Sequence, residues 1–260
     1  MSIPTSYGDE LMEAVTKFFK NLRFFSWILW SLFHIRKFGA EADRCRVAGD
    51  FRGEREAILK ASSWWGAKIT QKFGADIRAE GLERIPAEPA LFVSNHQAYG
   101  DIFVFLALFR KRQIGFVAKQ NLGKLPFFGR WIRRIRSVFL VQGDPRAAVE
   151  VFREGEEYLR EGFSLVIFPE GTRYLGDGMA SFKKGSLRLA LRTGVPVVPV
   201  TIRGSWHLYE EKGYIRPHTV NFYVHPPIET ASLTKEEAAG LAERVEGIVR
   251  SKLDEWNGVV

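Results

Sequence analysis

The chain has 260 residues, enough for one α/β domain of ordinary size with a small appendage. Apolar residues make up 46% of it and charged residues 26%, which excludes a disordered chain, a collagen and a coiled-coil rod. The single cysteine, Cys45, cannot form an internal disulfide and belongs to no zinc-site spacing, so we expect an inert thiol in a reducing compartment.

The positive charge is concentrated in one segment. Lysine and arginine total 38 against 30 aspartate and glutamate, a formal net charge of +8. The stretch from Ile102 to Gly143 has nine of these basic residues and no acidic residue, so it holds the whole excess. We therefore expect a local patch aimed at anions, that is, phosphates, lipid headgroups or nucleic acid.

The first 72 residues are expected to form a helix pair that associates with a membrane. Residues 1–13 lack the basic start and the cleavage site of a secretory signal. The most apolar stretch, Phe24–Ile35, is shorter than the roughly 20 apolar residues that span a bilayer. Eight Phe and Trp residues from Phe18 to Phe38, with basic residues on both sides, favour a helix seated in one leaflet. The alternative is a core helix of about 12 residues.

A second helix is predicted over Glu54–Lys72, where Ile58, Ala61, Trp65 and Ile69 recur at helical spacing. Residues 73–89 are rich in glycine and proline, which is typical of a connection with a short strand. The predicted organisation is a membrane-seated helix pair at 1–72 and an α/β domain at 73–260.

From Ala90 onward, short β-rich runs alternate with helical stretches. This alternation predicts an α/β fold with a mixed, mostly parallel sheet covered by helices, and with ligands at the carboxyl ends of the strands. Asp144-Pro145, Gly162 and Gly194 mark helix ends, and Thr234 with Glu237 forms a predicted capping box. The expected strands are Ala90–Ser94, Ile114–Ala118, Val138–Val141, Leu165–Phe168, Val195–Ile202 and Val220–His225.

His96 and Asp101 follow the first of these strands and form a candidate catalytic pair. Positions five apart on a helix diverge by roughly 140°, so the two side chains cannot pair within one helix. We expect His96 in the turn after the strand and Asp101 at the opening of the next helix, where Asp101 would fix the imidazole tautomer. The alternative is an Asp101 that caps the helix beside an incidental histidine.

The run Phe168–Arg173 (FPEGTR) follows another apolar strand and is typical of an anion-recognising loop. Arg173 suits bidentate phosphate binding, and Glu170 suits a cation or a substrate hydroxyl. A solvated Glu170–Arg173 pair on a turn is the alternative. The sequence has no phosphate loop GxxxxGK[ST], no HExxH, no GxSxG and no GxGxxG, so serine and nucleotide hydrolysis have little support.

Four blocks, in order, resemble those of the glycerolipid acyltransferases, typified by bacterial 1-acyl-glycerol-3-phosphate acyltransferase. The resemblance covers about Ile85 to Ile228. The chain departs from the family at Leu140-Val141-Gln142, where an Ile-Asp-Arg-like tripeptide is usual. The matching blocks are Asn95-His96-x4-Asp101, then Lys119 with Leu122, Pro126 and Gly129, then Phe168–Arg173, then Val195–Val200.

By this resemblance His96 would be the general base, Asp101 its orienter, and Lys119 and Arg173 the ligands of the acceptor phosphate. Asn95, Glu170, Gly171 and Thr172 would complete the substrate-binding loop.

The reaction implied is acyl transfer from acyl-CoA or acyl carrier protein, as co-substrate, to a lysophospholipid, most simply lysophosphatidic acid. Neither a metal nor a redox cofactor is implied. We expect a peripheral or monotopic enzyme on the cytoplasmic face of a bacterial inner membrane, with membrane lipids as partners. Alternatives are an acyltransferase for another lyso-lipid, such as a lyso-ornithine lipid, and a non-catalytic lipid-binding module. Nucleic-acid binding is not expected, because no nucleic-acid-binding motif frames the arginines.

Overall fold

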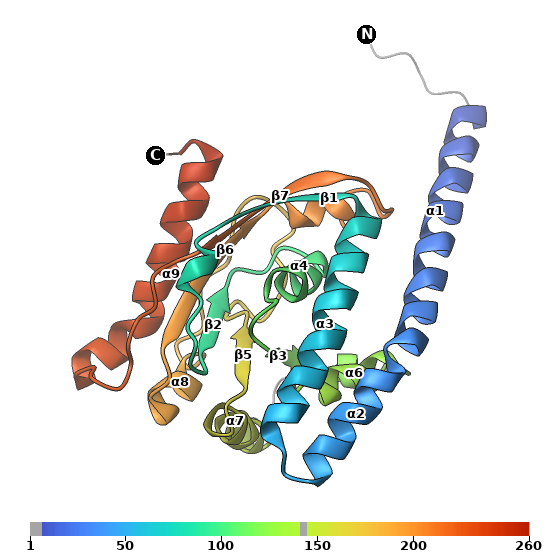
Figure 1. The fold of residues 1–260 in the computed structure, drawn as a ribbon. Coiled ribbons are helices and arrows are strands. Elements are labelled where there is room, and N and C mark those ends of the chain that lie inside the picture. Colours follow the sequence, from blue (N-terminus) through green and yellow to red (C-terminus); the bar gives the residue numbers. More distant parts are fainter. Residues whose placement is uncertain (1–6, 141–144, 260) are drawn as a thin grey trace.

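The computed structural model describes residues 7–140 and 145–259. A seven-stranded sheet in the order β1-β7-β6-β2-β5-β3-β4 lies between helices (Figure 1). All neighbouring strands are parallel except β6 and β7, which confirms the predicted mixed, mostly parallel sheet. The strands are β1 Ala75–Glu80, β2 Leu91–Ser94, β3 Ile114–Lys119, β4 Val138–Leu140, β5 Ser164–Ile167, β6 Val197–Arg203 and β7 His218–Val224.

Two apolar layers cover the sheet, one on each face. The central strands β2 and β5 are buried along their whole length, because helices cover both of their faces. One layer joins α3 (Phe51–Phe73) and α4 (Gly100–Leu108) to residues such as Phe92 and Phe222. The other joins α8 (Arg188–Thr193) and α9 (Lys235–Asn257) to Leu91 and Leu165. Both layers leave the carboxyl ends of the parallel strands free to build a site.

The helix ends agree with most of the predicted signals. Thr234 and Glu237 form the capping box at the start of α9, and Gly194, at φ +73°, follows α8. Helix α8 begins at Arg188. Helix α7 (Pro145–Arg160) is followed by Gly162, at φ +92°. The cap predicted at Asp144 lies outside the described residues. Two short helices, α5 (Gln120–Gly123) and α6 (Phe128–Arg134), link β3 to β4.

The N-terminal region has three helices where a pair is predicted. These are α1 (Tyr7–His34), α2 (Arg36–Val47) and α3. The predicted second helix corresponds to α3, which the Asp50 carboxylate caps by accepting a hydrogen bond from the Gly53 backbone N–H at 2.9 Å. None of the helices described between residues 7 and 259 has the length and apolar character needed to cross a bilayer.

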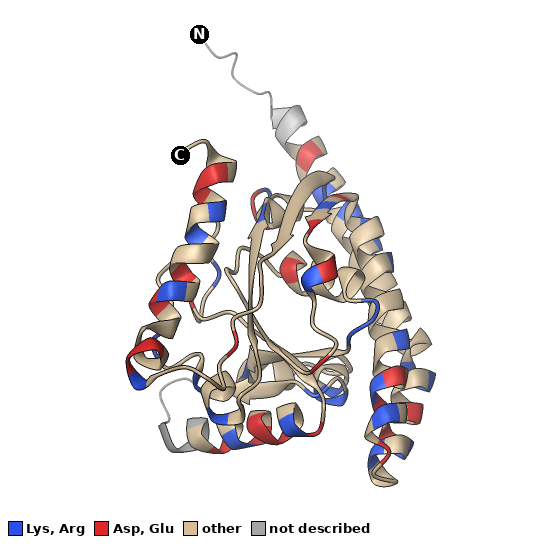
Figure 2. Cartoon of the chain, turned by 60° about the vertical axis from the view of Figure 1, so that its left-hand side comes forward, with Lys and Arg blue, Asp and Glu red and all other residues tan. Residues whose placement is uncertain are grey.

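Helix α1 buries one edge and exposes another apolar surface. Phe24, Ser31 and Ile35 are buried, and the Trp65 indole N–H of α3 donates to the Ser31 hydroxyl at 2.8 Å. The rest of the helix flanks the molecule (Figure 1) and carries no Lys, Arg, Asp or Glu after Arg23 (Figure 2). Its large exposed side chains, which we call the outer face of α1, are Leu11, Met12, Val15, Phe18, Phe19, Leu22, Phe25, Leu29, Trp30 and Phe33.

Helix α3 shares one core with the sheet. Trp65 and Ile69 are buried in the same cluster as Phe92. The fully buried Glu54 carboxylate accepts hydrogen bonds from Arg136, at 2.7 Å to each oxygen, and from Arg46 at 2.8 Å. Breaking such a buried pair is strongly destabilising. The division at residue 72 stays a prediction, and Phe24, Ile35 and Ala42 belong to the same cluster, so removing residues 1–72 would also remove part of the core.

Candidate active site

His96 and Asp101 meet at the carboxyl end of β2, as the spacing predicts. His96 lies in the turn after β2, and Asp101 lies in the first turn of α4. The His96 Nδ1 atom is 2.8 Å from Asp101 Oδ2. Because a carboxylate only accepts hydrogen bonds, this contact places the ring proton on Nδ1 and leaves Nε2 unprotonated. His96 Nε2 has no hydrogen-bond partner in the described part of the chain.

The Asp101 carboxylate is fixed from several directions. It is fully buried, and Oδ2 accepts from the backbone N–H groups of Gln97 at 2.8 Å and Ala98 at 3.0 Å. Its other oxygen accepts from the Ser205 hydroxyl, which follows β6. These bonds satisfy the buried charge and hold the carboxylate where it orients the imidazole. An incidental histidine beside a helix cap does not account for this arrangement.

The His96 ring is held in place but is still accessible. It stacks on Phe168, with ring centroids 4.0 Å apart and planes 18° apart, and its side chain is 16% exposed. The His96 carbonyl accepts from the Tyr174 backbone N–H at 2.7 Å. The ring is therefore clamped by the segment that follows β5, while one edge faces solvent.

Glu170 also holds the turn that carries His96. Its two oxygens accept from the backbone N–H of His96 at 2.6 Å and of Ala180 at 2.7 Å. Burial raises the pKa of Glu170 to about 7, although both of these hydrogen bonds oppose the rise. Both oxygens are occupied, so Glu170 holds the backbone of His96, whereas the sequence suggested a partner for a cation or substrate hydroxyl.

Asn95 also departs from its predicted place. Its amide is fully buried, donates to the Ile202 carbonyl at 2.8 Å and accepts from the Ile202 N–H at 2.9 Å. The side chain thus completes the backbone pairing between the ends of β2 and β6. We correct its assignment from substrate contact to positioning of the turn that carries His96.

Arg173 lies over Tyr99 and pairs with a residue that the sequence did not single out. Its guanidinium carbon is 3.8 Å from the centroid of the Tyr99 ring, and Nη1 is 3.3 Å from Glu210 Oε1. Burial raises the pKa of Glu210, whose Oε1 also accepts from the Tyr99 N–H at 2.7 Å. Arg173 is paired with Glu210, so the alternative of a solvated Glu170–Arg173 pair does not hold. Its side chain stays 31% exposed, with donors left for a ligand.

The other predicted residues lie around this turn. Thr172 is exposed, and Gly171 has φ +68°, where a Cβ would lie 2.6 Å from Lys183 Nζ. Only glycine avoids both the strain and the contact. Lys119 is exposed at the carboxyl end of β3, which pairs with β5 in parallel. The structure therefore brings Lys119 to the same edge of the sheet as His96, with β5 between β3 and β2.

The basic segment 102–143 is not one patch. Arg134 pairs with Asp43 of α2 at 2.7 Å, and Arg136 is buried against Glu54. Arg112 precedes β3, at the opposite end of the strand from Lys119, and donates to the Pro86 carbonyl. Lys119 is exposed at the carboxyl end of β3, and Lys124 and Arg130 are exposed in the α5–α6 connection that follows it.

Several residues that build the site were missed in the sequence. Ser205 and Glu210 follow β6, which ends at the same edge, and Gln97 bridges the Gly204 N–H and the Gly176 carbonyl at 2.8 Å each. The polar run after β6 was the available signal. Within residues 7–140 and 145–259, no three His, Cys, Asp or Glu side chains are grouped as ligands for a metal ion.

The known proteins to which the chain is similar are acyltransferases. A family model described as Acyltransferase matches residues 76–203. A chloroplastic 1-acyl-sn-glycerol-3-phosphate acyltransferase of Arabidopsis thaliana is 34% identical over 177 residues, which cover 65% of this chain and 49% of that protein. The enzyme of that name from Pseudomonas aeruginosa is 27% identical over 193 residues, 74% and 73% of the two chains. The chain spans about half the length of the plant relatives.

A solved structure is similar over almost the whole chain. The crystal structure of the 1-acyl-sn-glycerophosphate acyltransferase of Thermotoga maritima superposes with a TM-score of 0.78 at 31% sequence identity. The match covers 94% of this chain and 97% of that one. The likeness therefore includes the N-terminal helices as well as the α/β region.

Proposed function

The chain belongs to the glycerolipid acyltransferase family, and from this membership we propose that it is an O-acyltransferase that acylates a lysophospholipid. The acyl group comes from an acyl thioester, acyl-CoA or acyl carrier protein, and the acceptor is 1-acyl-glycerol-3-phosphate, which gives phosphatidic acid. The observation that carries the proposal is the His96–Asp101 contact of 2.8 Å, which leaves a basic Nε2 at an accessible edge of the sheet.

His96 acts as the general base. Its Nε2 removes the proton of the acceptor hydroxyl while that oxygen attacks the thioester carbonyl carbon. The carbon–sulfur bond then breaks, and the departing thiolate, whose thiol has a pKa near ~8.5, takes back the proton from the imidazolium. A leaving group of this kind requires no acyl-enzyme intermediate. The Asp101 carboxylate stabilises the imidazolium during the step.

Two cations at the carboxyl edge suit the acceptor phosphate. Lys119 is exposed after β3, and Arg173 presents a guanidinium fixed by Glu210 and Tyr99. Arginine in a fixed orientation binds phosphate oxygens bidentately, whereas lysine contributes a mobile charge. Thr172 and Gly171 complete this loop. Gln142, the departure from the family pattern, lies outside the described residues.

The outer face of α1 supports seating in one leaflet of a membrane. It exposes Phe18, Phe19, Trp30 and Phe33, with Lys17, Lys20 and Arg23 before the apolar stretch and Arg36 after it. Aromatic rings at the headgroup level with basic flanks are typical of a helix lying in the interface. We place the enzyme, as a peripheral or monotopic protein, on the cytoplasmic face of a bacterial cell membrane, where the acceptor lipid is found.

A panel of acceptors tests this function. Purified protein is offered a radiolabelled acyl thioester with lysophosphatidic acid, lysophosphatidylethanolamine or a lyso-ornithine lipid in mixed micelles, and labelled products are separated. We expect transfer to lysophosphatidic acid at the highest kcat/KM. If another lyso-lipid is the preferred acceptor, the proposal that lysophosphatidic acid is the substrate is wrong. If folded protein transfers no acyl group to any of them, the assignment as an acyltransferase is contradicted.

A further inference from the structure

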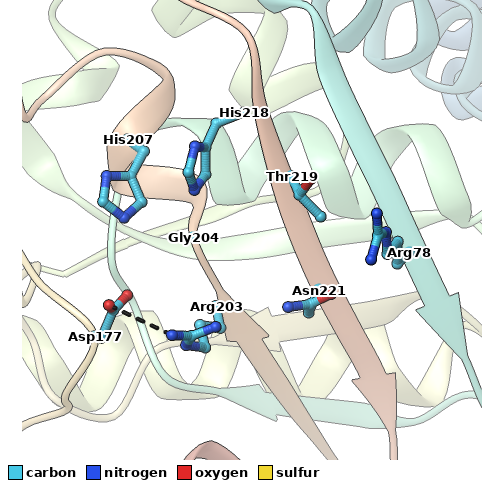
Figure 3. Close-up of a pocket in the computed structure, with 8 residues that line it drawn as sticks. All are labelled: Arg78, Asp177, Arg203, Gly204, His207, His218, Thr219 and Asn221. Carbon is cyan, nitrogen blue, oxygen red and sulfur yellow. Dashed lines mark ion pairs between the residues drawn. The ribbon is translucent and has the colours of Figure 1, made fainter. Parts of the chain in front are cut away.

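A cavity of about 250 Å³, whose lining residues Figure 3 shows, lies next to the turn that carries His96, which with Asp101 we call the dyad. Gln97, the residue after His96, separates the two, because it binds both Gly204 of the cavity and Gly176, the neighbour of Asp177. The side chains that matter lie on β1, β6 and β7, in η2 (Ser205–Leu208) and in the segment between β5 and α8. They are Arg78, Asp177, Arg203, His207, His218 and Asn221.

One wall is a row of side chains across three strands. Arg78 of β1 is the register partner of Asn221 of β7, and Asn221 is the partner of Arg203 of β6. Directly opposed residues in neighbouring strands point to the same face of a sheet. The row therefore sets an amide between two guanidinium groups (Figure 3).

Most polar atoms around this space are uncommitted donors. Within the described residues, the Asn221 amide and the His218 ring have no hydrogen-bond partner. Arg78 uses Nε for Asp76 at 3.3 Å, and Arg203 uses Nε for Asn257 at 2.6 Å. The Arg203–Asp177 ion pair is 3.7 Å long, beyond hydrogen-bond distance, so the terminal nitrogens remain free for a better acceptor.

The two histidines differ: the neutral His218 ring supplies one N–H donor, whereas His207 gives its Nδ1 proton to Glu211 and offers an acceptor at Nε2. Their rings lie 4.1 Å apart, and His207 uses only Nδ1, for Glu211 at 2.8 Å. Burial lowers the pKa of both imidazoles, and the positive charges of Arg216 and Arg203 lower it further. The negative charge of Asp177 raises the pKa of both rings and so opposes this shift. Asp76 and Asp177 neutralise part of the arginine charge. A ligand that suits these groups carries several acceptor oxygens and a negative charge, as a phosphate ester does.

The floor of the cavity requires a glycine. Gly204 has φ +92°, and a Cβ there would lie 2.5 Å from the Thr219 carbonyl oxygen. The cavity lies on the β6–β7 side of β2, whereas Lys119 lies on the other side, after β3. The dyad at the end of β2 therefore has an anion-binding group on each side along the edge.

We propose that this cavity binds a phosphate group of the acyl donor's carrier. The inference rests on the proposed acyl transfer, in which both substrates are phosphorylated. The acceptor phosphate is assigned to Lys119 and Arg173, neither of which lines this cavity, so the cavity is left for the donor. Coenzyme A and acyl carrier protein both present a phosphopantetheine, so the shared chemistry is a phosphate ester joined to the thioester arm.

A binding experiment tests the cavity without acyl transfer. The full chain is titrated by calorimetry with 4′-phosphopantetheine and with pantetheine, which differ by one phosphate. We expect at least tenfold tighter binding of the phosphorylated compound, and loss of this preference in Arg78→Gln and Asn221→Asp. Asn221→Asp keeps the side-chain volume and breaks no hydrogen bond, so it should fold. Arg188→Gln, on an exposed position of α8, is the control.

A kinetic experiment then identifies the substrate. In both cavity variants the KM for acyl-CoA should rise at least tenfold, with kcat and the acceptor KM unchanged. With acyl-pantetheine, which has no phosphate, the variants should equal the parent. Equal binding of the two pantetheines, or a rise confined to the acceptor KM, would overturn the proposal. The binding experiment does not require turnover. A protein that transfers no acyl group but still prefers phosphopantetheine would therefore refute the proposed function and leave the assignment of the cavity standing.

Discussion

Asp101 receives hydrogen bonds from an imidazole, two backbone N–H groups and a hydroxyl. In Asp101→Asn, an amide NH₂ would face donors that need an acceptor, and the imidazole would lose its fixed tautomer. We expect kcat to fall roughly 10²–10⁴-fold, with little change in acceptor KM. Steady-state kinetics on protein with a native circular dichroism spectrum measures this effect. Parental kcat would show that Asp101 serves only as a helix cap.

Glu170 makes stability depend on pH. Its folded-state pKa of about 7 is above the ordinary value of 4.5, so the folded protein holds this proton more tightly than the unfolded chain. The stabilisation is fully present below pH 4.5 and is lost as pH rises through 7. Relative to Glu170→Gln, the parent should lose roughly 2–3 kcal/mol of unfolding free energy between pH 5 and pH 8. Urea unfolding of both proteins at each pH measures the difference, and a constant difference would contradict the raised pKa.

Lys119 and Arg173 should act on binding and not on chemistry. If each holds the acceptor phosphate equally in ground and transition states, Lys119→Ala and Arg173→Ala raise the acceptor KM strongly and leave kcat near the parental value. Each charged hydrogen bond lost is worth roughly 1.5–3 kcal/mol, or about 10- to 150-fold. An uncharged lyso-acceptor, assayed in parallel, should show little effect. A similar rise in KM for the charged and the uncharged acceptor would show that Lys119 and Arg173 do not bind the phosphate.

At the scale of elements, α1 should hold the protein on membranes mainly through its outer face. Each exposed aromatic ring is worth roughly 1.5–3 kcal/mol on burial in lipid, and each basic residue near an anionic surface about 1 kcal/mol. Replacing Phe18, Phe19, Leu29 and Phe33, all more than half exposed, by serine should abolish sedimentation with vesicles and spare the fold.

Salt separates the two contributions. The parent should stay on vesicles of anionic lipid at high salt and should need detergent for release, because salt screens charges but not apolar burial. The serine variant keeps only the charge attraction, so any binding to anionic vesicles that remains should be lost as the salt concentration rises. Complete release of the parent by salt alone would mean that the outer face of α1 does not enter lipid.

For the molecule as a whole, periodicity and local geometry predicted the features that depend on residues close together in the sequence. The runs at β2 and β5 are buried on both faces, so they appear as unbroken apolar stretches. His96 and Asp101 are five residues apart and would point in different directions on one helix, so the sequence indicated that they could pair only across the end of a strand and the start of a helix. The contacts of Asp101 with Ser205 and of Tyr99 with Glu210 span 104 and 111 residues, and no local pattern records them.

Residue type alone did not show which way a side chain points. Asn95 and Glu170 belong to matching motifs, yet both are turned inward to hold backbone groups. Arg134 and Arg136 belong to a basic segment, yet acidic partners on α2 and α3 pair with them. The charge count was correct, but the partners came from elements about 80 to 90 residues away.

The transfer rate of His96→Ala is the most direct test of the account. The side chain is partly exposed and contributes little to the core, so the variant should fold and bind vesicles as the parent does. With lysophosphatidic acid and a labelled acyl thioester, we predict that transfer becomes undetectable, because no other base faces the acceptor hydroxyl in the mechanism. Folded His96→Ala protein that transfers acyl groups at the parental rate would contradict it.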